Sequence, residues 1–258
     1  MQTVLFHDII FGPIKSRRLG ISLGINLLPT DGKICSFDCI YCECGYNAQG
    51  KGSGINKRED IKAALEHKLQ EMKEKGEVPD VLTFAGNGEP TLHPDFETII
   101  DDTIELRDRY FPNAKVSVLS NATCISKETV FNALNKVDNN ILKLDSAYTE
   151  TIRLINNPNV RNYTAEQLIE NLRRFNGNLI IQTMFLRGQH NGRIVDNTTE
   201  QEISAWLEAI KQIRPKQVMI YTIDRQTPEK KLEKIPVHEM NAIADRVRAL
   251  GFDISVSA

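Results

Sequence analysis

The sequence predicts an α/β protein, a partial (β/α)6 TIM-like barrel of parallel strands, from two patterns along its 258 residues. Short runs rich in β-branched residues alternate with segments whose apolar residues recur every three or four positions. Six such strand–helix units in succession imply parallel strands joined by helical crossovers of one hand. No repeat, low-complexity tract or long linker divides the chain, so we expect residues 1–258 to form a single domain.

The predicted strands carry the indication of a barrel. They span residues 21–27, 81–85, 116–120, 141–145, 179–185 and 218–223, with a weaker seventh at 252–256. In the fourth strand, Lys143 and Asp145 share one face, while Leu142 and Leu144 share the other. An apolar face for helices and a polar face for a lumen suit a ligand-holding barrel better than a sheet buried on both sides. The active site is then expected at the C-terminal ends of the strands.

Amphipathic helices are predicted between these strands. Their apolar positions fall within residues 61–72, 96–104, 168–172, 203–210 and 243–250. Thr164 with Gln167 and Thr199 with Glu202 have the spacing of capping boxes at two helix starts. Gly251 ends the last helix.

Composition narrows the class of protein. Hydrophobic residues make up 41% of the chain and charged residues 26%, which excludes extended disorder. The formal net charge of -2 argues against a nucleic-acid coat or a polybasic membrane binder, although one local basic patch is compatible with it. No apolar run approaches the roughly 20 residues that cross a bilayer, and the first residues lack the features of a signal peptide. We therefore expect a cytoplasmic protein with no membrane partner.

Four of the five cysteines crowd into the predicted loop at about 29–55, at Cys35, Cys39, Cys42 and Cys44. A disulfide framework would spread them along the chain. Thiolates separated by three and then two residues, as in the first three, can converge from one loop as iron–sulfur ligation requires. Three ligands leave one iron of a cubane open. The alternative is structural zinc with Cys44 as fourth ligand, but such sites usually join two more widely separated cysteine pairs.

The Cys-x3-Cys-x2-Cys pattern, with Tyr41 directly before the third cysteine, resembles the cysteine motif of the radical S-adenosylmethionine superfamily. The resemblance implies a [4Fe-4S] cluster on Cys35, Cys39 and Cys42, whose open iron binds S-adenosyl-L-methionine. It implies reductive cleavage to methionine and a 5′-deoxyadenosyl radical, which abstracts hydrogen from a substrate. It also implies an external electron donor, flavodoxin- or ferredoxin-like. Cys44 and Cys124 are not expected to be ligands.

The turn after the second strand supports the same resemblance. Asn87, Gly88, Glu89 and Pro90 are similar to the family's Gly-Gly-Glu-Pro motif, which binds the amino end of S-adenosylmethionine, with Asn in place of the first glycine. Glycine lets a backbone approach a ligand, and a carboxylate suits an ammonium group. The alternative is a plain turn that closes a strand.

The resemblance also implies that residues at the ends of later strands bind S-adenosylmethionine. Ser120, Asn121 and Asp145 would bind the ribose hydroxyls or the methionine carboxylate, and Tyr221 would lie along the adenine. The alternative for the first three is strand-end capping, which Ser, Asn and Asp favour. For Asp145, a second alternative is a structural ion pair with Lys143.

A narrower likeness is carried by residues 13–20, 35–39, 88–94, 143–146 and 221–225. They resemble uncharacterised iron–sulfur oxidoreductases related to enzymes that build the tricyclic base of wyosine-type transfer RNA. Those relatives carry a second cysteine set and a basic extension, which this chain lacks, so we expect one cluster and a small-molecule or peptide substrate. Modification of tRNA or another nucleic acid by the same chemistry is one alternative, and a non-catalytic iron–sulfur or zinc scaffold is another.

Arginines near the strand ends suggest a charge preference for the substrate. Arg187 and Arg225 follow the fifth and sixth strands, and at the open rim they would hold an anionic substrate. Solvated surface arginines are the alternative. Arg17 and Arg18 precede the first strand and have no role that the sequence defines.

Overall fold

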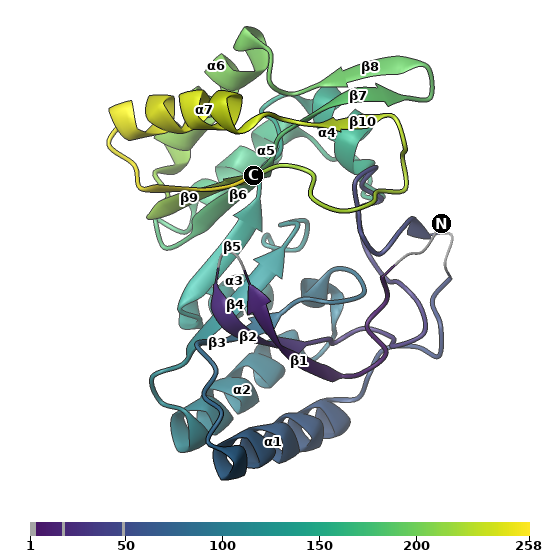
Figure 1. The fold of residues 1–258 in the computed structure, drawn as a ribbon, viewed down its shortest axis with the longest axis vertical. Helices are drawn as coiled ribbons and strands as arrows, with labels where there is room; N and C mark the ends of the chain where they lie inside the picture. Colours follow the sequence, from purple (N-terminus) through teal and green to yellow (C-terminus); the bar gives the residue numbers. More distant parts are fainter. Residues whose placement is uncertain (1–3, 17–18, 48–49) are drawn as a thin grey trace.

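The computed structural model describes residues 4–16, 19–47 and 50–258. Within these ranges the main element is an eight-stranded sheet that curls into a half-barrel, in the order β1-β2-β3-β4-β5-β6-β9-β11 (Figure 1). The strands are β1 (Ile10–Ser16), β2 (Gly20–Ile25), β3 (Val81–Phe84), β4 (Lys115–Ser120), β5 (Asn139–Lys143), β6 (Ile180–Met184), β9 (Gln217–Tyr221) and β11 (Ile254–Ser257).

The strands from β2 to β11 are parallel, and only the edge strand β1 among those described in this sheet pairs in the antiparallel sense, with β2. The α/β class and the partial parallel barrel predicted from the sequence are therefore confirmed. The weaker seventh strand corresponds to β11, which extends the barrel beyond β9.

Helices cover the outer face of the sheet. Figure 1 shows α1 and α2 beside the β2–β4 part and α6 and α7 beside β6 and β9. The helices are α1 (Arg58–Lys75), η2 (Pro90–Leu92), α2 (Phe96–Tyr110), α3 (Glu128–Lys136), α4 (Thr149–Asn156), α5 (Ala165–Arg173), α6 (Glu200–Ile213) and α7 (Val237–Ala249). Their apolar faces and alternate strand residues, including the fully buried Leu142 and Leu144, form one continuous core.

The helix starts agree in part with the predicted capping boxes. The hydroxyls of Thr164 and Thr199 accept hydrogen bonds from the backbone N–H groups of Gln167 and Glu202, at 3.2 and 3.3 Å. The Glu202 side chain does not complete its box, because its carboxylate accepts a hydrogen bond from Ser146 instead.

A second, three-stranded sheet lies beside the half-barrel, in the order β10-β7-β8. Its strands are β7 (Leu186–His190), β8 (Arg193–Asp196) and β10 (Leu232–Lys234). The sequence pattern did not predict this sheet, nor β1, α3 and α4. These elements are short or exposed, so few positions in them show a periodic apolar pattern.

The inner face of the half-barrel changes from apolar to polar along the strands. Ile141, Ile180 and Met219 form a separate buried cluster, against which Leu119 packs. On β5, two residues beyond Ile141 toward the C-terminal end, the inner face presents Lys143, which lines a cavity. Among the helices of the described ranges, none combines the length and apolar character that crossing a bilayer requires.

Candidate active site at the mouth of the half-barrel

A cavity of about 290 Å³ opens at the C-terminal ends of β4, β5, β6 and β9. One side is formed by the cysteine loop and the turn after β3, and the other by side chains of the later strands. Nine of the twelve residues that the sequence assigned to the cluster or to S-adenosylmethionine line it, and Asn87, Pro90 and Asp145 do not. The lining consists of Cys35, Phe37, Cys39, Tyr41, Cys42, Glu43, Gly88, Glu89, Leu119, Ser120, Asn121, Lys143, Gln182, Met184 and Tyr221.

Hydrogen-bond donors surround two of the three cysteine sulfurs. The Phe37 N–H donates to Cys35 Sγ at 3.4 Å, and Asn121 Nδ2 donates to the same sulfur at 3.6 Å. Asn156 Nδ2, at the end of α4, donates to Cys39 Sγ at 3.4 Å. Burial raises the pKa of the Cys35 thiol, and it raises the pKa of Cys39 to about 12. These donors are of the kind that tunes metal–sulfur sites from the second coordination layer.

Cys42 has the opposite electrostatic setting. A hydrogen bond from the Cys44 thiol lowers the pKa of Cys42 to about 6 against the effect of burial, and the Lys33 ammonium assists. The Lys33 side chain is 1% exposed, and its Nζ donates to the Gly45 carbonyl. Burial opposes the charge on Lys33, but the negative charge of the nearby Cys42 raises its pKa above the ordinary range. A buried positive charge thus lies behind the cysteine loop.

The donor set fits an iron–sulfur cluster. Three cysteines of one loop face a common cavity, with N–H donors directed at their sulfurs and a buried ammonium nearby, and each thiolate of a cubane binds a different iron. In the described part of the chain, no three His, Cys, Asp or Glu side chains are close enough together to hold a single metal ion.

The turn after β3 is bound to the cysteine loop through its backbone. Gly88 forms an isolated parallel bridge with Ile34, and the Glu89 N–H donates to the Ile34 carbonyl at 3.0 Å. Gly88 has φ +135°, and a Cβ atom there would lie 1.8 Å from the Ile34 carbonyl oxygen. Glycine is therefore required at position 88 for the close approach of the two segments.

Glu89 is buried at the centre of a hydrogen-bond network. Its Oε1 accepts from the Thr91 N–H at 3.1 Å and from Ser120 Oγ at 2.8 Å, and its Oε2 accepts from the Asn121 N–H at 2.6 Å. Burial raises the pKa of Glu89, although these hydrogen bonds oppose the rise. The network fixes the carboxylate at the cavity wall, where a cationic group would relieve the cost of burying its charge.

Asn87 and Pro90 shape this turn without facing the cavity. Asn87 is fully buried, and its Nδ2 donates to the carbonyls of Phe6 and Pro29 at 2.8 and 2.7 Å. The side chain that replaces a glycine thus ties the turn to the N-terminal segment. Pro90 occupies the first position of the short helix η2, where a residue without an N–H is favoured.

Asp145 lies behind the wall of the cavity. Its Oδ1 accepts from the Met184 N–H at 2.9 Å, and its Oδ2 accepts from Asn156 Nδ2 at 2.7 Å and from the Tyr41 hydroxyl. Lys143 Nζ lies 3.7 Å from the same Oδ2. The carboxylate connects the cysteine loop to β5, β6 and α4.

The wall opposite the cysteines is formed by side chains of β5, β6 and β9. Lys143 Nζ donates to the Tyr221 hydroxyl at 3.0 Å and lies 5.2 and 5.6 Å from the ring centroids of Tyr41 and Tyr221. The negative charge of Asp145 raises the pKa of Lys143 above its ordinary range, although burial acts against the charge. Gln182 follows on the neighbouring strand β6.

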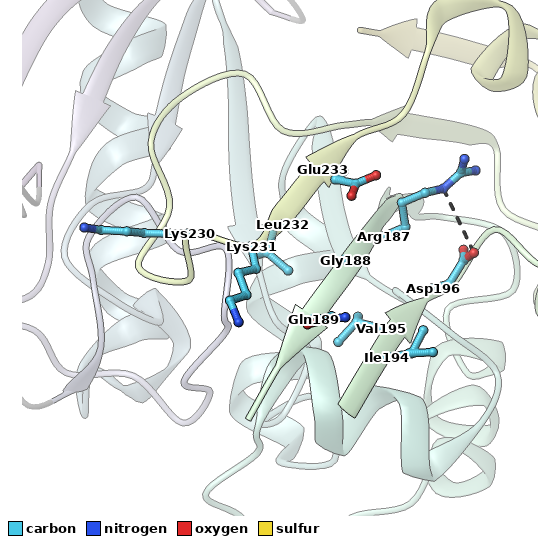
Figure 2. Close-up of a pocket in the computed structure, with 10 residues that line it drawn as sticks. All are labelled: Arg187, Gly188, Gln189, Ile194, Val195, Asp196, Lys230, Lys231, Leu232 and Glu233. Atoms are coloured by element: carbon cyan, nitrogen blue, oxygen red, sulfur yellow. Dashed lines mark ion pairs between the residues drawn. The ribbon is translucent and has the colours of Figure 1, made fainter. Parts of the chain in front are cut away.

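The two arginines expected at the rim form ion pairs with carboxylates of the chain. Arg187 lies in a separate hollow of about 600 Å³ along β7, β8 and β10 (Figure 2), where it pairs with Asp196 and with Glu239. Arg225 Nη1 donates to Glu43 Oε2 at 2.7 Å, so it reaches only the edge of the cavity. Arg17 and Arg18 lie outside the described residues.

The other two cysteines are placed differently from each other. Cys44 Sγ lies 3.5 Å from the Gly86 carbonyl oxygen, beside the cavity. Cys124 is 7% exposed and belongs to the core between sheet and helices. Neither lines the cavity.

Comparison with known proteins identifies the class of this site. The profile of the radical SAM superfamily matches residues 30–198, and the chain belongs to this superfamily of enzymes, whose members use S-adenosylmethionine and an iron–sulfur cluster. Within it the chain belongs to the UPF0026 family. A UPF0026 protein of Synechocystis is 30% identical over 244 residues, which cover 92% of this chain and 84% of that protein.

Other relatives are longer than the matched region. A UPF0026 protein of Methanocaldococcus jannaschii is 33% identical over 86% of this chain and 65% of its own length. A Brachyspira hyodysenteriae protein named GTPase Obg is 30% identical over 90% of this chain, which spans only 32% of that protein.

Solved structures share the fold at low sequence identity. A radical SAM methyltransferase from Sphaerobacter thermophilus has a TM-score of 0.68 and 13% identity, covering 91% of this chain and 65% of its own. TYW1 with a lysine-pyruvate adduct bound has a TM-score of 0.61 and 15% identity, covering 88% of this chain and 73% of its own.

Several residues at this site were not singled out as site residues from the sequence, and four of them matter to its chemistry. Lys33 and Gln182 carry no motif, and Met184 reads as an ordinary strand residue. Asn156 ends a helix that the pattern did not predict. Gln182 shares its face of the strand with the apolar Ile180 and Met184, so the alternation along residues 179–185 gave no signal that could have found it.

Proposed function

We propose that this chain holds one [4Fe-4S] cluster through Cys35, Cys39 and Cys42 and cleaves S-adenosylmethionine reductively, to abstract hydrogen from a small-molecule or peptide substrate. The observation that carries the proposal is the cavity itself, which the three cysteines share with Gly88 and Glu89. When bound together, the reduced cluster and S-adenosylmethionine supply the electron and the adenosyl group for hydrogen-atom abstraction.

Different residues of the chain bind different parts of S-adenosylmethionine. Glu89, fixed by its hydrogen bonds, accepts the ammonium group of the methionine part. Ser120 and Asn121 orient that carboxylate, since both donate to it, and they close the wall for the rest of the molecule. Tyr221 borders the adenine side. Asp145 supports this wall from behind through Tyr41 and Asn156.

An external one-electron donor, flavodoxin- or ferredoxin-like, is the proposed partner. Cys35 and Cys42 are only partly buried, so the cysteine loop offers a short path for an electron from the surface. We propose a cytoplasmic setting, because the thiols must stay reduced until they bind iron.

The test is formation of 5′-deoxyadenosine by anaerobically reconstituted protein with dithionite and S-adenosylmethionine, followed by chromatography. The wild type is expected to form it slowly without its true substrate. Cys39→Ala is expected to form none, and Cys124→Ala, a matched change in the outer core, is expected to form as much as the wild type. Equal product from the wild type and Cys39→Ala would refute the proposal.

A further inference from the structure

Two side chains at the bottom of the cavity have no role in binding S-adenosylmethionine in the scheme above. Lys143 and Gln182 are register partners on β5 and β6, and both line the cavity. One layer deeper, the inner face is closed by Ile141 and Ile180, and Met219, the register partner of Gln182 on β9, joins the same apolar cluster. Lys143 and Gln182 are therefore the last polar groups that a ligand meets before the apolar floor.

The Gln182 amide is the clearest sign that this part of the cavity binds a hydrogen-bond acceptor. Gln182 is only 7% exposed, and within the described ranges its Nε2 has no hydrogen-bond partner. A buried amide donor without an acceptor is unfavourable, and most buried polar groups in proteins are satisfied. Because the side chain lines the cavity, an acceptor on a bound molecule can satisfy it.

Lys143 adds a fixed positive charge beside this donor. An ammonium has three N–H donors. One of them reaches the Tyr221 hydroxyl at 3.0 Å, and Asp145 Oδ2 lies 3.7 Å away, beyond a normal hydrogen bond. Asp145 also accepts hydrogen bonds from three other groups, so it compensates the ammonium only in part.

The charged groups around Lys143 and Gln182 determine which charge a group bound there can carry. The carboxylates that line the cavity are Glu43 and Glu89, and both belong to the side of the cysteine loop and the turn. Just above the apolar floor, the cavity has a cation and an amide donor on adjacent strands, and Met184 and Leu119 also line it. A carboxylate takes up both donors at once, whereas an ammonium group is repelled there.

We propose that Lys143 and Gln182 bind a carboxylate group of the substrate, and that the carbon chain beside it packs against Met184 and Leu119. This assignment rests on the proposed function, because it takes the opposite wall to be occupied by S-adenosylmethionine. It makes the substrate an organic acid or a peptide with a free carboxylate at the reacting end.

The test uses butyrate as the probe, with butyramide and butylamine as neutral and cationic matches. Saturation-transfer NMR on anaerobically reconstituted protein with S-adenosylmethionine is expected to show butyrate binding at least tenfold more tightly than butylamine, with butyramide between them. Butyrate binding no tighter than butylamine binding overturns the subsite.

The diagnostic variant is Gln182→Leu, which replaces the amide by a side chain of similar size. We expect it to weaken butyrate binding about fivefold and to leave the melting temperature of the ligand-free protein unchanged or higher, since it removes an unsatisfied group. Gln189→Leu makes the same change on the exposed surface of β7 and is expected to alter neither quantity. Unweakened butyrate binding, or a lowered melting temperature in Gln182→Leu, overturns the assignment.

The two proposals fail in different ways. A wild type that forms no 5′-deoxyadenosine contradicts the proposed function whatever butyrate does. A wild type that forms it but does not prefer butyrate contradicts only the carboxylate subsite.

Discussion

The two sides of the cavity are built on different principles. On the side of the cysteine loop and the turn, backbone bridges and hydrogen bonds satisfy the polar groups, as for Glu89 with its partners from Thr91, Ser120 and Asn121. On the side of β5 and β6, the polar side chains project from strands, and the Gln182 amide has a donor without a partner among the described residues. The first arrangement suits a cofactor that is always the same, because its geometry is fixed before binding. The second leaves recognition to a ligand that varies.

The largest effect of any substitution is expected for a cysteine of the loop side. Cys39→Ala removes one of three proposed ligands and should abolish retention of iron and sulfide after reconstitution. Cys124→Ala should retain the wild-type iron content and cost only about 1 kcal/mol of stability, from the loss of a small buried side chain. Iron and sulfide analysis checks both variants, and cluster loss in Cys124→Ala would place a ligand outside the cavity.

Gly88→Ala tests whether the turn depends on its backbone contact. The new Cβ would lie 1.8 Å from the Ile34 carbonyl oxygen, so we expect a loss of about 3 kcal/mol, near the upper range for overpacking, and reduced iron content. Gly76→Ala is the control, because Gly76 also has a positive φ, of +71°, but nothing lies within 4 Å of its Cβ position.

Only the left-handed backbone is strained in this control, so its cost should be about 1 kcal/mol with no loss of iron. Thermal melts and iron analysis measure the pair. Similar effects of the two substitutions would show that the bridge to Ile34 is not needed for the site.

Asp145→Asn distinguishes a structural role of this carboxylate from a role in binding S-adenosylmethionine. The substitution leaves Lys143 buried without its carboxylate, so we expect destabilisation of about 2 kcal/mol, less than for a fully enclosed pair because Lys143 reaches the cavity. Since Asp145 does not line the cavity, the affinity for S-adenosylmethionine should change less than twofold. Melting curves and calorimetric titration decide it, and weaker binding at unchanged stability would return Asp145 to the ligand site.

Lys33→Met gives the smallest expected effect on the cysteine side. Removing a buried positive charge behind the loop should lower the cluster potential by on the order of 50 mV, since net charge sets such potentials. Lys68→Met, in a half-buried ion pair of α1 with Glu71, is the control and should leave the potential unchanged. Redox titration followed by electron paramagnetic resonance measures both, and equal potentials would remove Lys33 from the electrostatics of the site.

The sequence predicts the cysteine side better than the strand side for a physical reason. Cys35, Cys39 and Cys42 belong to one loop, so their spacing alone indicates that they can converge. Gln182 gains its meaning only from its register partner on β5 and from the lack of an acceptor for its amide among the described residues, and neither leaves a trace in the spacing of residues. Arg187 shows the same limit, because its partners Asp196 and Glu239 come from β8 and α7.

The elements of the fold also differ in how well the sequence predicted them. The strands with β-branched runs were predicted within a few residues, because burial on a parallel sheet requires them. β1 was missed since its residues are mostly exposed, and α4 was missed since its eight residues give little more than two turns of pattern. Asn156, the last residue of α4, was missed for the same reason.

The most direct test of the central claim is the electron paramagnetic resonance spectrum of the reduced, reconstituted wild type with and without S-adenosylmethionine. If the cysteine side holds a cluster with one open iron, a reduced [4Fe-4S] signal should appear, and S-adenosylmethionine should shift its g values. Glu89→Gln should require a higher S-adenosylmethionine concentration for the same shift. A cluster signal that S-adenosylmethionine leaves unchanged in the wild type would contradict the account.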